Sequence, residues 1–111
     1  MNTTTTTAHL GRNVGNAPMS STRWHAYQVA TREAIRQHAN TSGTQVLDIT
    51  HTTGTGVWEG ASEDCAVISV TTTGMPDMET LTHVLAGLAN DYDQDAIALA
   101  HGPSVLIGRA S

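Results

Sequence analysis

The strongest constraint in the sequence is a set of apolar residues at helical spacing in its C-terminal third. They fall on one face of a helix that begins near Pro76, and the set consists of Met78, Leu81, Val84, Leu85, Leu88 and Tyr92. Pro76 suits the first turn of a helix, while Asp77 and Glu79 favour the positive end of its dipole. A helix with one apolar face must bury that face, so the rest of the chain has to supply a layer for it to cover.

The other segments predict a second helix and four strands. Serine caps and apolar spacing place a helix from about residue 22 to 39, and the glycines of the segment 51–56 predict a flexible loop. Strands are expected at 44–50, 65–71, 96–100 and 104–107, the last two joined by a turn at His101-Gly102-Pro103. The expected fold class is α+β in the order α-β-β-α-β-β, with two helices packed on one face of a four-stranded, mainly antiparallel sheet.

Residues 1–20 look unable to join this core. A run of threonines from Thr3 to Thr7 is followed by glycines, asparagines and a proline. Such a segment buries too little apolar surface to offset its ordering entropy. We therefore expect a disordered Thr-rich tail at 1–20 and a single α+β domain at 21–109. Threonine also favours β structure, so an alternative is an arm that exchanges onto the sheet edge of a partner.

Charge and composition exclude several classes of function. The 111 residues include five arginines, no lysine and ten acidic residues, for a formal net charge of −5. Nucleic-acid binding normally needs a basic surface, so we expect no nucleic-acid partner. No stretch resembles a membrane span or a signal peptide, so we expect no membrane partner. The single cysteine, Cys65, lies in an apolar segment and reads as a core thiol in a reducing compartment, which indicates a cytoplasmic protein.

The predicted sheet has more apolar surface than two helices can cover. Its second, third and fourth strands look apolar on both faces. A bare apolar face is an interaction site, so we expect a homodimer or a host protein partner on that face or on a sheet edge. A monomer at micromolar concentration in light scattering would count against the homodimer.

The densest polar cluster lies around Trp58, Glu59 and Glu63, between the glycine-rich loop and an apolar strand. Its carboxylates suit a divalent cation or acid–base chemistry, but loop carboxylates are usually just solvated, which is the reading we favour. The alternation of Asp91, Asp93 and Asp95 likewise favours turn chemistry over a metal site.

No motif of catalysis or metal binding stands out. The six histidines form no pair at metal-ligand spacing, and there is no Cys-x-x-Cys, so we expect no metal and no cofactor. His51 stands beside the glycine-rich loop, where it is a candidate ligand-binding residue. The loop is a weak phosphate signal because it lacks a following helix and a basic residue.

The stretch from Trp58 to Ile97 resembles a family of small uncharacterised α+β domains from phages and bacteria. The residues that carry this resemblance are Gly56-Val-Trp58, Glu63, the strand 66–70, the helix 81–89 and Tyr92-Asp-Gln94-Asp95-Ala-Ile97. The resemblance implies no established activity, but it marks Trp58, Glu63 and Gln94. Both Glu63 and Gln94 precede a predicted strand, and if they meet, we favour a structural hydrogen bond over a polar pocket floor.

These observations leave two functional hypotheses. The favoured one is a non-enzymatic binding protein, such as a phage accessory or anti-defence factor in the host cytoplasm that binds a host protein or a small signalling ligand. Its candidate ligand-binding residues are Trp58, Glu59, Glu63, Gln94 and His51, with no catalytic residue assigned. The alternative is a small enzyme that acts on a nucleotide or another phosphate ester.

Overall fold

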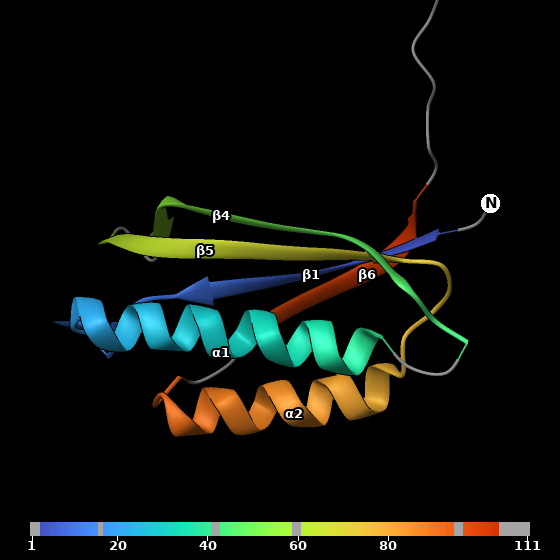
Figure 1. The fold of residues 1–111 in the computed structure, drawn as a ribbon. Helices are drawn as coiled ribbons and strands as arrows, with labels where there is room; N and C mark the ends of the chain where they lie inside the picture. The colour runs from blue at the N-terminus through green and yellow to red at the C-terminus, as the bar shows by residue number, and fades with distance from the viewer. Residues whose placement is uncertain (1–2, 16, 41–42, 59–60, 95–96, 105–111) are drawn as a thin grey trace, which may run out of the picture.

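A computed structural model describes residues 3–15, 17–40, 43–58, 61–94 and 97–104. Two helices, α1 (Ser21–Ala39) and α2 (Met78–Asp91), form one layer and an antiparallel sheet forms the other (Figure 1). The sheet has the order β4-β5-β1-β6, with β4 at Val46–Trp58, β5 at Ala61–Thr72, β1 at Thr3–Gly11 and β6 at Ala98–Ser104. The short strands β2 (Asn13–Val14) and β3 (Ala17–Pro18) pair with each other. The α+β class and the two-layer arrangement are confirmed.

The threonine-rich segment is the main departure from the sequence prediction. Residues 3–11 form β1, which pairs antiparallel with β5 on one side and β6 on the other. The prediction of a disordered tail is therefore wrong for these residues, and the strand is paired within its own chain. With the short β2 and β3 included, the element order becomes β-β-β-α-β-β-α-β.

Alternation explains why these threonines form a strand. Thr4, Thr6, Ala8 and Leu10 face the helices and are buried, so the threonine methyl groups add to the core. On the opposite side, Thr5 Oγ1 lies 3.2 Å from Thr71 Oγ1. A second cross-strand pair joins Thr7 Oγ1 to Ser69 Oγ at 2.9 Å. Residues 3–11 therefore form a half-buried central strand despite their polar composition.

Two further local predictions are wrong. The residues 51–56 are not a loop, because β4 runs through them and pairs with β5 up to Trp58 opposite Ala61. The predicted hairpin around His101–Pro103 is replaced by the single strand β6, in which Thr4 is opposite Pro103. Proline is tolerated there because β6 is an edge strand with one unpaired side. The predicted strand at 104–107 extends past Ser104 into residues outside the described part of the chain.

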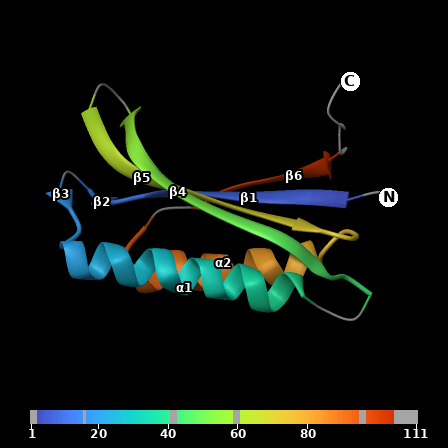
Figure 2. The same ribbon diagram turned by 45° about the horizontal axis from the view of Figure 1, so that its top comes forward.

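The helices lie close to their predicted positions. Ser20 caps α1 by accepting the Arg23 backbone N–H, and Asp77 caps α2 by accepting that of Thr80. Both helices cover the same face of the sheet (Figure 2). The largest fully buried side chains of the core are Tyr27, Leu10, Ile35, Ile68 and Leu81.

The uncovered face of the sheet, which we call the open face, differs from the expected apolar surface. Its centre carries the partly exposed hydroxyls of Thr5, Thr7, Ser69 and Thr71, which bond to one another in cross-strand pairs. The reason lies in β1, because this threonine-rich strand occupies the middle of the sheet. In the described part of the chain, neither helix has the length and apolar character needed to cross a membrane.

Candidate functional site

A pocket with a volume of about 370 Å³ lies between α2 and β6, and we call it the α2–β6 pocket. The residues that line it come from one face of α2, the turn that follows and the approach to β6: Thr82, Leu85, Ala86, Ala89, Asn90, Gln94, Ile97 and Leu99. Only three of these side chains are polar, and none of them is ionisable. The pocket is therefore apolar and uncharged, with a few groups that can direct hydrogen bonds.

The sequence of α2 explains why this side of the helix is hollow. Leu85 is 3% exposed and belongs to the core, but the residues beside it, Ala86 and Ala89, are small. Alanines one turn apart leave space between the helix and the first residues of β6, where longer side chains would fill it. Ile97 and Leu99 provide the apolar wall opposite the helix.

The turn after α2 fixes the position of Gln94. Its backbone N–H donates to the Ala89 carbonyl at 2.7 Å, and that of Asp93 donates to the Asn90 carbonyl at 3.2 Å. These two bonds make a Schellman turn, with Asp93 in the left-handed position at φ 57°. Arg23 also donates to the Asp91 carbonyl at 3.2 Å and pairs with the Asp93 carboxylate at 3.0 Å. These contacts stabilise the turn at the end of α2.

Glu63 and Gln94, which the sequence resemblance singled out, meet at Asn13. Glu63 Oε1 accepts the Asn13 backbone N–H at 2.8 Å, and Gln94 Nε2 donates to the Asn13 carbonyl at 3.0 Å. The Glu63 carboxylate also lies against Gly11, where an added Cβ would collide with it. The two side chains thus hold the backbone just after β1 from two directions. Gln94 alone also lines the pocket, so it connects this backbone clamp to the candidate ligand site.

His51 belongs to a different polar group, between β4 and α1. Its Nδ1 lies 3.4 Å from Arg32 Nη1, and its Nε2 lies 2.9 Å from Gln28 Oε1. Because arginine can only donate, Nδ1 is the acceptor of this contact. The ring hydrogen is therefore on Nε2, which donates a hydrogen bond to Gln28 Oε1. Burial lowers the pKa of His51 below its ordinary value of 6.5, and the positive charge of Arg32 and the nearby His25 lower it further.

A neutral His51 makes stability depend on pH. The unfolded chain takes up a proton at this position near pH 6.5, whereas the folded chain resists it, so folding stability is lost as the pH falls below that value. We expect a smaller loss in His51→Gln, because glutamine does not titrate. Urea unfolding at pH 7.5 and pH 5.5 measures the difference. An equal loss of free energy of unfolding in both proteins would contradict a neutral, hydrogen-bonded His51.

The other residues singled out in the sequence do not join this pocket. The backbone of Trp58 ends β4 in a two-stranded ribbon, formed with β5, that curves away from the helices (Figure 2). The Trp58 side chain, Glu59 and Asp95 lie outside what the structure describes. Within the described residues, no group of three or more histidine, cysteine or acidic side chains is arranged to hold a metal ion.

Sequence reasoning missed most of the pocket. Asn13 lay in the segment set aside as a tail, and the alanines of α2 read only as a helix face. The one available signal was the pair of small residues, Ala86 and Ala89, within an otherwise leucine-rich apolar face. That signal indicates a hollow only when a facing element is known, and β6 was predicted with a turn in its middle.

No known family model matches the sequence, and no curated protein resembles it closely enough to count as a relative. Solved structures do share its fold. A phage SAM lyase in its apo state is 14% identical, with a TM-score of 0.56, over 90% of this chain and 79% of that one. A phage SAM lyase in complex with S-methyl-5′-thioadenosine is 12% identical, with the same TM-score, over 90% of this chain and 80% of that one. At these identities the likeness shows a common fold.

Proposed function

We propose that the protein binds a small, uncharged nucleoside of the adenine class in the α2–β6 pocket. The observation that carries this proposal is the pocket itself, with apolar walls and amide or hydroxyl groups at Thr82, Asn90 and Gln94. Its volume of about 370 Å³ lies within the range of about 300–1,000 Å³ that small-molecule sites occupy.

The lining of the pocket suits a purine base. A flat, weakly polar ring gains from apolar walls such as Leu85, Ile97 and Leu99. Side-chain amides present a donor and an acceptor together, which is why Asn and Gln recognise the edge of adenine. The complex of a phage SAM lyase with S-methyl-5′-thioadenosine supports the same ligand class on this fold.

The pocket does not suit a phosphate. None of its described lining residues is basic, and it lies beside the C-terminal half of α2, where the helix dipole is negative. An anion bound there would lose its hydration without gaining a compensating charge. The pocket therefore supports a neutral nucleoside over the nucleotide or phosphate ester considered from the sequence.

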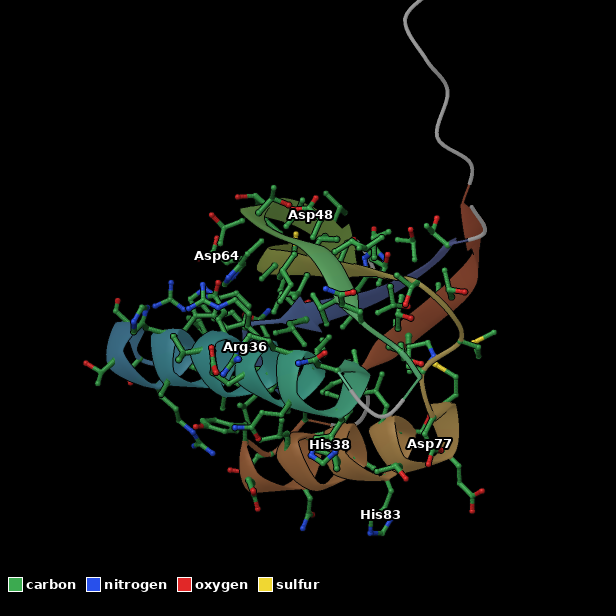
Figure 3. The ribbon with its side chains drawn as sticks, turned by 45° about the vertical axis from the view of Figure 1, so that its right-hand side comes forward. Arg36, His38, Asp48, Asp64, Asp77 and His83 are labelled. Atoms are coloured by element: carbon green, nitrogen blue, oxygen red, sulfur yellow. The ribbon has the colours of Figure 1, made fainter. Side chains whose placement is uncertain are left out.

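Isothermal titration with S-methyl-5′-thioadenosine tests the proposal. We expect saturable binding to the full chain, and at least a roughly tenfold loss in Ala86→Phe, because the phenyl ring fills the pocket. The matched control is His83→Phe on the same helix. His83 is exposed, does not line the pocket and points away from the sheet (Figure 3). No binding to the natural chain, or equal binding to both variants, would contradict the proposal.

We also propose a biological role for this binding. The likeness to a phage protein supports a phage accessory or anti-defence role, in which the protein acts by holding a host nucleoside. An enzymatic role is the alternative, supported by the lyase whose fold this chain shares. Incubation of the chain with SAM decides between them, because a lyase would release S-methyl-5′-thioadenosine and a binding protein would leave SAM intact.

A homodimer or a host protein partner is still proposed, but the surface that would bind it is polar at its centre and not apolar as the sequence suggested. The open face carries hydroxyls paired across the strands, and a partner that covers them would have to supply an acceptor for the one hydroxyl of each pair that does not donate to the other. Light scattering remains the test.

A further inference from the structure

We infer that Gln94 gives the α2–β6 pocket a hydrogen-bond acceptor in a fixed position, Oε1, and that the group it recognises is the 6-amino group of the purine. This inference rests on the proposed function, and it names Gln94 Oε1 as the atom that recognises the base.

The orientation of the Gln94 amide follows from its partner. The Asn13 carbonyl oxygen can only accept, so the group at 3.0 Å from it must be the Gln94 NH₂. The other end of the amide, Oε1, is an acceptor, and no described residue donates a hydrogen bond to it. Gln94, which lines the pocket, therefore keeps an unused acceptor at Oε1 beside the second N–H of its amide.

This orientation is fixed at both ends of the contact. The Gln94 backbone is held by the Schellman turn, and the Asn13 backbone is held by Glu63 at 2.8 Å. Rotating the amide by half a turn would bring Oε1 against the Asn13 carbonyl oxygen and replace a hydrogen bond with a repulsion. A free glutamine can exchange the positions of its donor and acceptor, whereas this glutamine holds Oε1 in one place, where only a donor group of the ligand can bind to it.

The pocket also has an inner and an outer end. Gln94 is partly buried, while Thr82 and Asn90 are exposed. An apolar base fits the inner end, and a ribose with its hydroxyl groups fits the exposed rim, where water can reach it. In that placement the edge of the base faces Gln94, and its 6-amino group supplies the donor that Oε1 lacks.

Adenosine and purine riboside test this inference, because they differ only in the 6-amino group. We expect the full chain to bind adenosine about tenfold more tightly than purine riboside, since the analogue leaves Oε1 without a partner in a partly buried site. In Gln94→Met the two affinities are expected to become similar. Gln28→Met, which removes an amide from the His51 group, is the control and should keep the preference.

The outcomes separate this inference from the proposed function. Equal binding of adenosine and purine riboside by the natural chain would overturn the role of Gln94 and leave the nucleoside site intact. Binding of neither nucleoside nor of S-methyl-5′-thioadenosine would overturn both. The comparison of the two nucleosides needs no variant, so it holds even if Gln94→Met fails to fold after losing the contact with Asn13.

Discussion

Replacing Ala8 by Asp is expected to unfold the protein. Ala8 is 0% exposed in the middle of β1, between Ile68 of β5 and Leu99 of β6. A carboxyl group at this position would be buried against apolar side chains without a partner. We expect a loss of about 3 kcal/mol or more in the free energy of unfolding, which is a large fraction of the stability of a small domain. Circular dichroism during urea titration measures it.

The matched control is His9→Asp, one residue further along the same strand. His9 is exposed on the open face, so the same carboxyl group would stay in water. We expect a change within about 0.5 kcal/mol. If Ala8→Asp were as harmless as His9→Asp, the first residues would not form a central strand, and the disordered tail expected from the sequence would be the better description.

Tyr27→Ala is expected to lower the free energy of unfolding, whereas Tyr27→Phe is expected to raise it. The Tyr27 side chain is 0% exposed, and its ring stacks on that of Tyr92 with centroids 4.8 Å apart. Truncation to Ala leaves a cavity between the helices and the sheet, so we expect a loss of roughly 3–5 kcal/mol in the free energy of unfolding. Urea unfolding of the variant, compared with the natural chain, measures this loss.

Tyr27→Phe is expected to raise the free energy of unfolding by about 1 kcal/mol. The Tyr27 hydroxyl is buried and has no hydrogen-bond partner among the described residues, and burial raises the pKa of this group well above its ordinary value. Phenylalanine keeps the ring and its stacking while removing the unpaired hydroxyl. A clear loss of stability in Tyr27→Phe would mean that the hydroxyl is satisfied in the folded protein.

The helices and the fold class were predictable because their signals are local. The apolar spacing of α2 and the caps at Ser20 and Asp77 act within a few residues, so a single sequence contains them in full. The two-layer arrangement then follows from the need to bury an apolar helix face.

The central strand was not predictable from the same kind of signal. The threonine run has too few apolar residues to read as a buried strand, and its inward face becomes evident only when β5 and β6 stand on either side of it. The prediction of a turn at His101–Pro103 was wrong for the same reason, because β6 pairs with β1 along its whole length. Pairing partners distant in sequence decided both cases.

The candidate site was predictable only in part. The pattern that marked Glu63 and Gln94 also allowed a structural hydrogen bond, and the structure shows each of them bonded to Asn13. The pocket depends on the space between α2 and β6, which no pattern within either element reveals. His51 was selected for its neighbouring glycines, yet its partners are on α1, at Gln28 and Arg32.

A titration of the ¹⁵N-labelled chain with S-methyl-5′-thioadenosine, followed by amide chemical shifts, tests the central claim most directly. We expect the largest shifts on pocket residues from Thr82 to Leu99, including Gln94, and accompanying shifts of the backbone around Asn13. Shifts centred on His51 and Arg32 or on the open face, or no shifts at saturating ligand, would contradict a nucleoside site between α2 and β6.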